Sequence, residues 1–211
     1  MPRLVLAPFV LLLILGCVRA QPQPPVATPA ALVPESCVDV PQTKLCAELL
    51  ELRDRDQAVR RKWMADRENE ALQQEVETVD RENVVRVIEI INATGWPGKL
   101  MVGEKGSAAA WTILQHADLE VQKRYLGRME KAVETGELHG SLLATTVDRI
   151  RVREGQPQLY GTQFREQNGR MEPFPIENEA EVAFRRAKVG LQPLSEYAAM
   201  VNQMYSQPKK P

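Results

Sequence analysis

The stretch TKLCAELLELRDRDQAVRRKW, residues 43–63, decides the fold class of this chain. Its apolar residues recur at intervals of three and four, which predicts a helix with one buried stripe. The stripe consists of Leu45, Leu49, Leu52, Val59 and Trp63. Asp56 occupies a position in it where another apolar residue is expected. A buried Asp56 needs a partner, which Arg60 can supply one turn later, unless this edge of the helix is solvated.

Similar periodicity predicts helices over most of the remaining chain. The expected helices cover about 80–92 before the breaker Gly95-Trp96-Pro97-Gly98, 107–117 with Ser107 as N-cap, 118–136 opened by Asp118, 141–153, a segment from the capping pair Asn178 and Glu181 to Gly190, and one from Pro193 through Met204. The pattern of 141–153 is mixed near its end, so its last turn is helix or strand.

After Gly155 the pattern changes to period two. Residues 159–164 and 171–176 flank Asn168-Gly169, a dipeptide typical of tight hairpin turns. Pro173 and Pro175 restrict the second strand to a sheet edge because proline lacks an amide proton. The expected fold is therefore mainly α (α+β), a single helical domain with a small C-terminal β-hairpin.

The N-terminus predicts export. Arg3 precedes an apolar run over residues 4–15, which is too short to span a bilayer as a helix and ends in Gly16-Cys17. We expect a signal peptide over residues 1–20, cut either before Cys17, which is then lipidated, or after Ala20. The position of Cys17 at the end of the apolar run favours lipidation. The expected location is the bacterial cell envelope, lipid-anchored on the membrane surface, and the alternative is a soluble periplasmic or secreted form.

Residues 21–36 are rich in proline and predict an extended tether. The remaining segment, residues 37–211, suits one globular domain. It contains Cys37 and Cys46, and an even pair of cysteines in an oxidising compartment predicts a disulfide bond. The alternative, a metal site, is poor because no histidine lies near the two thiols in the sequence.

Charge and composition exclude some classes of partner. The chain has 27 basic and 28 acidic residues, so a nucleic-acid partner is not expected. With only two histidines, His116 and His139, it cannot form a multi-histidine zinc site, and neither a metal nor another cofactor is expected.

The polar sequence Gln115-His116-Ala117-Asp118 is the main candidate for chemistry. His116 lies at the end of a predicted helix, where the helix dipole favours its protonation. In one interpretation, His116 is a core or capping residue and Asp118 is the N-cap of the next helix. In the other, both face a pocket with polar residues of the hairpin and nearby tryptophans. The hairpin residues expected there are Gln158, Tyr160 and Thr162, which alternation places on one strand face, or Gln163 on the other face. The other candidates are Gln115, Arg149, Trp96 and Trp111.

Several strings in this sequence resemble a known family. They are, in order, Asp56-Gln57, Gly95-Trp96-Pro97, Ala109-Ala110-Trp111, Gln115-His116-Ala117-Asp118, Asp148-Arg149, the segment from Gly155 to Gln163, Pro175-Ile176-Glu177, Arg185-Arg186-Ala187, Gly190-Leu191 and Pro193-Leu194. Together they resemble the bacterial domain of unknown function 6624 family over nearly the whole domain. The resemblance implies a shared fold and a shared polar site, and it names no reaction.

Three functions follow from these residues, and the sequence leaves open whether the protein is an enzyme. The first is binding of a neutral polar small molecule, peptide or glycan in the pocket around His116. The second is hydrolysis, with His116 as general base oriented by Asp118 or Asp148, and with Tyr160 or Arg149 stabilising negative charge. The third is a structural scaffold that holds an unidentified protein partner on an exposed helical stripe containing Leu49 and Trp63. Binding ranks first and hydrolysis second.

Overall fold

The structure is a computed structural model, and it describes residues 34–206. The expected signal peptide, the lipidation site Cys17 and the tether up to residue 33 lie outside the described residues. No helix among residues 34–206 is both long enough and apolar enough to cross a membrane.

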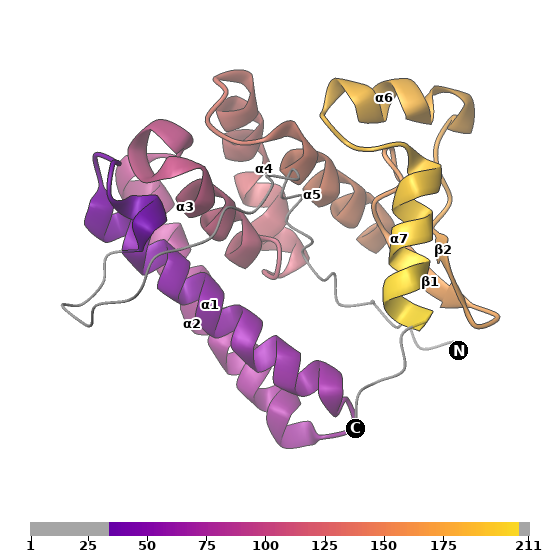
Figure 1. Ribbon diagram of the computed structural model, residues 1–211, viewed down its shortest axis with the longest axis horizontal. Helices are drawn as coiled ribbons and strands as arrows, with labels where there is room; N and C mark the ends of the chain where they lie inside the picture. Colours follow the sequence, from indigo (N-terminus) through magenta and orange to yellow (C-terminus); the bar gives the residue numbers. More distant parts are fainter. Residues whose placement is uncertain (1–33, 207–211) are drawn as a thin grey trace, which may run out of the picture.

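The described chain is mainly helical, as the sequence predicts. Its elements are the 3-10 helix η1 (Glu35–Cys37), α1 (Thr43–Ala65), α2 (Glu70–Thr94), α3 (Lys99–Leu114), α4 (Leu119–Glu134), α5 (Gly140–Arg153), β1 (Phe164–Gln167), β2 (Arg170–Pro173), the 3-10 helix η2 (Glu179–Glu181), α6 (Val182–Lys188) and α7 (Leu194–Ser206). Helices α1 and α2 form a long pair, α3 packs on both, α4 packs on α5, and α7 lies against β2 (Figure 1).

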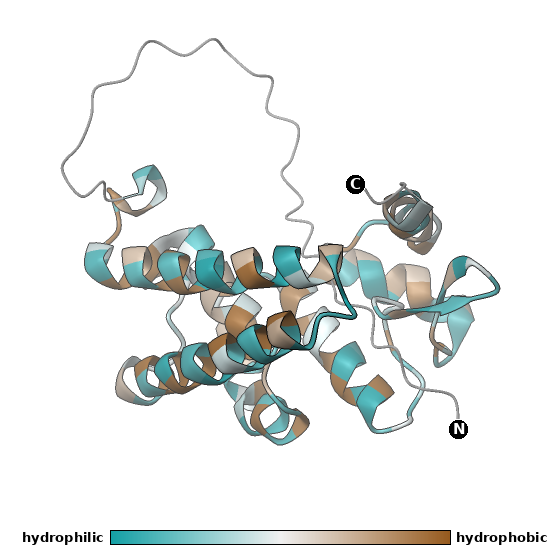
Figure 2. Cartoon of the chain, turned by 90° about the horizontal axis from the view of Figure 1, so that it is seen from below, coloured by the Kyte–Doolittle hydropathy of each residue, from teal (hydrophilic) through white to brown (hydrophobic). Residues whose placement is uncertain are grey.

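The main core lies where α1, α2, α3 and α4 meet. Leu49, Ile91, Trp111 and Met129 are fully buried there. Figure 2 shows hydrophobic and hydrophilic stretches alternating along the helices, as expected when one side of each helix is buried. Trp63 packs on a smaller cluster between the far ends of α1 and α2. The predicted stripe of α1 is thereby confirmed.

Two helices begin earlier than the sequence predicts. The second starts at Glu70 instead of about residue 80, because the side chain of Asn69 caps it by accepting the amide of Leu72 at 3.2 Å. The third starts at Lys99, and Ser107 lies inside it instead of capping it. Gly103 has a non-helical conformation with φ of 73°, so α3 consists of two helical segments that meet at a kink there.

Among the other local predictions, some are confirmed and some are wrong. Asp118 caps α4 as predicted, with its carboxylate accepting the amide of Val121 at 2.8 Å. The last turn of α5 is helical, so the strand alternative is wrong there. The Asn178–Glu181 capping pair is also wrong, because Asn178 adopts a left-handed conformation and its side chain caps no helix.

The hairpin is confirmed but is shorter than predicted. Phe164 pairs with Pro173, and Asn168 and Gly169 form the turn with positive φ angles of 53° and 76°. Residues 159–163 are not a strand, because amides in this loop bind the carboxylate of Asp148 instead of a neighbouring strand.

Cys37 and Cys46 form the predicted disulfide bond, with Cα atoms 5.7 Å apart. Both cysteines are fully buried, and the bond joins η1 to the first turn of α1.

Candidate functional site

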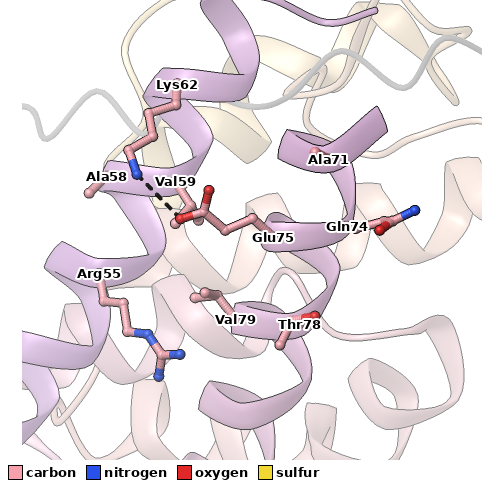
Figure 3. Close-up of a pocket in the computed structure, with 9 residues that line it drawn as sticks. All are labelled: Arg55, Ala58, Val59, Lys62, Ala71, Gln74, Glu75, Thr78 and Val79. Atoms are coloured by element: carbon pink, nitrogen blue, oxygen red, sulfur yellow. Dashed lines mark hydrogen bonds and ion pairs between the residues drawn. The ribbon is translucent and has the colours of Figure 1, made fainter. Parts of the chain in front are cut away.

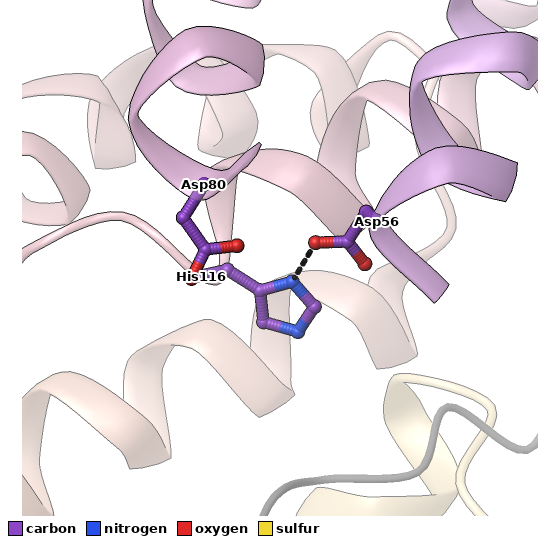
Figure 4. A group of neighbouring side chains, drawn as sticks. All are labelled: Asp56, Asp80 and His116. Carbon is purple, nitrogen blue, oxygen red and sulfur yellow. Dashed lines mark hydrogen bonds and ion pairs between the residues drawn. The ribbon is translucent and has the colours of Figure 1, made fainter. Parts of the chain in front are cut away.

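A buried aspartate–histidine pair forms the centre of the candidate site (Figure 4). The Nδ1 atom of His116 lies 2.9 Å from Oδ1 of Asp56, although the two residues are 60 positions apart. Asp56 lies on α1, and His116 lies in the turn between α3 and α4. The side chains are 1% and 6% exposed, respectively, so the pair is almost completely removed from water.

Asp56 is held as a carboxylate by three donors. Besides His116, Gln57 donates from Nε2 at 2.7 Å and Arg60 donates from Nε at 3.2 Å. Burial alone would raise the pKa of Asp56, but the hydrogen bonds and positive charge around it lower that pKa below its ordinary value. The partnership with Arg60 that the sequence suggests is confirmed, and His116 is a second partner.

The imidazole of His116 is neutral at neutral pH. Burial lowers its pKa to about 4, helped by the charges of Arg60 and Arg149 and opposed by Asp56. Burial is the largest cause, so the ring is not protonated at neutral pH, whatever the helix dipole contributes. Since an ionised Asp56 only accepts hydrogen bonds, the ring carries its proton on Nδ1 and leaves a lone pair on Nε2.

Asp80, on α2, completes the cluster. Its carboxylate pairs with Arg60, which thus contacts both aspartates. Burial raises the pKa of Asp80 to about 6, and the nearby charge of Asp56 adds to this, while Arg60 opposes it. Two carboxylates close together favour a proton on one of them, and Asp80 is the one with the raised pKa.

Helix α5 and one residue of α4 hold the turn that carries His116. Arg149 donates from a terminal guanidinium nitrogen to the carbonyl of Gln115 at 3.3 Å, and Arg153 donates to the carbonyl of Ala117 at 3.1 Å. Gln122 donates to both carbonyls. Burial, together with the charges of Arg153 and Arg60, lowers the pKa of Arg149 to about 9.

Neither aspartate proposed from the sequence to orient His116 does so; Asp56 does. Asp118 is exposed and caps α4. Asp148 is fully buried and accepts the amides of Leu159 and Tyr160, together with the amide and hydroxyl of Thr162. Its role is to fix the loop after α5.

The amide side chains proposed for a ligand pocket are buried. Gln158 and Gln163 bond to each other, with Gln158 donating to the carbonyl of Gln163 at 3.0 Å and accepting its amide at 2.9 Å. Tyr160 is partly exposed in the same loop. Gln115 is fully buried, and its side-chain amide has no hydrogen-bond partner among residues 34–206.

Trp111 belongs to the hydrophobic core, and the partly buried Trp96 packs against it. Trp111 is fully buried, and its Nε1 donates to the hydroxyl of Thr146 at 2.9 Å. Trp96 packs against the core and donates to Ser107 at 3.0 Å. The buried Trp111 therefore offers no stacking surface to a sugar or peptide.

A groove of about 530 Å³ lies elsewhere, between the far ends of α1 and α2 (Figure 3). Val59 and Val79 line it, and Lys62 and Glu75 pair across it at 3.3 Å. It includes none of the candidate site residues.

Asp56, Asp80 and His116 are also residue types that bind metals, and each offers one ligand atom within 4.8 Å of the others. Arg60 contacts both carboxylates and already supplies the positive charge that a metal ion would bring. The imidazole nitrogen nearest Asp56 carries a proton. The three residues therefore fit an acid–base cluster better than a metal site.

The fold and site define a helical domain with a buried acid–base cluster. The chain belongs to a family of unknown function (DUF6624), whose model matches residues 43–210, so the resemblance seen in the sequence is confirmed. No curated protein matches the chain. No solved structure matches it either.

Sequence reasoning identified His116, Arg149 and the unusual position of Asp56, but it missed Asp80. A signal for Asp80 exists in the sequence, because Asp80 and Asn83 interrupt the apolar stripe of α2 formed by Val76, Val79 and Val87. Because α1 and α2 pair through their apolar stripes, a carboxylate on each stripe indicates that the two carboxylates face each other.

Proposed function

We propose that this domain is a hydrolase in which His116 is the general base and Asp56 orients it. The buried contact of 2.9 Å between His116 and Asp56 carries this proposal. Isolating a carboxylate and an imidazole from water is costly unless each is paired, and the pair leaves Nε2 able to accept a proton.

The proposed reaction uses water as the nucleophile. Nε2 of His116 takes a proton from a water molecule that attacks the substrate, and the negative charge of Asp56 stabilises the imidazolium that forms. In this proposal Arg149 stabilises negative charge on the substrate; the effect of its positive charge on the imidazole supports this role.

Hydrolysis accounts for the geometry better than the two other functions expected from the sequence. Binding of a neutral ligand relied on Trp96 and Trp111, of which Trp111 is fully buried in the core. A scaffold relied on an exposed helical stripe, yet Leu49 in that stripe is fully buried. Neither function explains a neutral imidazole held by a buried carboxylate.

The proposal is tested with the mature chain and a panel of 4-nitrophenyl substrates: a carboxylic ester, a phosphate and a glycoside. His116→Gln is expected to lower turnover by about 100-fold or more, the usual contribution of a general base. His139→Gln is the matched control, because His139 is the second of two histidines and caps α5. Equal turnover in wild type and His116→Gln would reject the proposal.

A second measurement is independent of substrate. With two histidines in the chain, nitrogen-15 NMR resolves the ring of each by comparison with the variants. We expect His116 to be neutral at pH 7 with its proton on Nδ1. A proton on Nε2, or a charged ring at pH 7, would contradict the proposed role.

A further inference from the structure

We infer that Asp80 is the general acid of the same reaction and donates a proton to the leaving group while His116 activates water. This inference rests on the proposed hydrolase function. It adds a catalytic residue and a substrate class: carboxylic esters whose leaving group is a poorly acidic alcohol.

The position of Asp80 supports this role. One oxygen of its carboxylate lies within 4.8 Å of both a ring nitrogen of His116 and an oxygen of Asp56. Figure 4 shows Asp80 and Asp56 on opposite sides of the imidazole. The side chain of Asp80 is 22% exposed, more than Asp56 or His116, so it is the acid of the cluster that a substrate reaches most easily.

The surrounding charges favour different protonation states for the two aspartates. Asp56 receives hydrogen bonds from Gln57, Arg60 and His116, which favour its ionised form. The charged or titratable groups that face Asp80 are Arg60 and Asp56 from α1, and His116 from the α3–α4 turn. Asp56 repels negative charge on Asp80, and burial raises the pKa of Asp80 to about 6, so Asp80 keeps a proton in mildly acidic solution.

His116, Asp80 and solvent account for every proton of the reaction. Nε2 of His116 removes a proton from water, whose oxygen forms a bond to the carbonyl carbon of the ester. When the bond from that carbon to the alkoxy oxygen breaks, its electron pair stays on the oxygen, which takes the proton of Asp80. The products are a carboxylic acid and an alcohol; His116 then releases its proton to solvent, and the Asp80 carboxylate takes one up from solvent.

The experiment compares two esters of the same acid, 4-nitrophenyl butyrate and ethyl butyrate. The nitrophenolate leaves without protonation, whereas ethoxide requires it. Asp80→Asn is expected to lower hydrolysis of the ethyl ester by about 100-fold and that of the nitrophenyl ester by less than about 5-fold. Glu82→Gln is the control, since Glu82 is an exposed acid on the same helix that pairs with Arg55.

Each other result has a separate meaning. An equal loss on both esters, or no loss on either, overturns the role of Asp80 while leaving that of His116 intact. Loss of nitrophenyl ester hydrolysis in His116→Gln supports the general base on its own. If wild type hydrolyses neither ester, ester hydrolysis and with it the inferred substrate class are rejected.

Carbon-13 NMR of the aspartate carboxyl groups tests the proton on Asp80 without any substrate. A carboxyl resonance that titrates near pH 6 and disappears in Asp80→Asn is expected. If the resonance lost in Asp80→Asn titrates in the ordinary aspartate range, Asp80 is not a proton donor and the inference fails.

Discussion

Replacing His116 and Asp80 one at a time is expected to reveal opposite effects of pH on the stability of the domain. In the wild type the pH dependence of stability that His116 contributes nearly cancels the one that Asp80 contributes between pH 4 and 6.5. His116→Gln removes one effect and Asp80→Asn removes the other. The quantity to compare is the free energy of unfolding, measured by urea with the disulfide bond intact.

Asp80 has a pKa of about 6 in the folded domain and an ordinary value of 3.8. The folded state therefore holds a proton that the unfolded chain releases, and stability falls by about 3 kcal/mol as pH rises from 4 to above 6. His116 behaves in the opposite way, because its pKa is about 4 when folded and ordinarily 6.5. The unfolded chain binds a proton that the folded state excludes, so stability falls by about 3 kcal/mol as pH drops from 7 to 4.

Relative to wild type, His116→Gln should therefore become more stable as pH falls from 7 to 4, by about 3 kcal/mol, since only the Asp80 effect remains. Asp80→Asn should become less stable over the same range by a similar amount. If both variants keep the wild-type dependence on pH, the buried, shifted states of His116 and Asp80 are refuted.

Three further predictions concern the supports of the site. Asp56→Asn removes a carboxylate that accepts from three donors, so it should lower the free energy of unfolding in urea by about 3 kcal/mol. The control Asp54→Asn, on the exposed side of the same helix, should lower it by less than about 0.5 kcal/mol. Similar losses of stability in the two variants would contradict the buried pair. Asp148→Asn should cost about 2 to 4 kcal/mol and speed amide hydrogen exchange in the loop after α5, whereas unchanged exchange would show that the carboxylate does not hold this loop. Replacing Cys37 and Cys46 together by alanine should lower stability by about 2 to 3 kcal/mol, and a loss below about 1 kcal/mol would mean that the bond adds little to the fold.

Local signals in the sequence predicted the parts of the fold that depend on neighbouring residues. Asp118 caps α4 because its carboxylate needs only the amide three residues later. Asn168-Gly169 forms the hairpin turn because both residues tolerate positive φ. The loop at 159–163 was predicted as a strand because its pattern alternates, yet the buried carboxylate of Asp148 binds its amides. That carboxylate comes from another element, which periodicity does not reveal.

The site was predictable only in fragments, for a similar reason. Asp56 was recognised as a polar residue in an apolar stripe, and Arg60 as its partner, because the two lie one helical turn apart. His116 was recognised as a candidate, but its partner lies 60 residues away and its pKa depends on burial that the sequence does not specify. Asp80 can be assigned to the site only when α1 and α2 are known to pair face to face.

The last turns of α5 have a mechanical consequence for the whole C-terminal half of the domain. Asp148 holds the loop that leads into the hairpin, while its neighbour Arg149 and, one turn later, Arg153 hold the turn that carries His116. One part of α5 thus binds two segments that are distant in sequence. These contacts all come from residues 148–153, so the loop before the hairpin and the turn that carries His116 share one support.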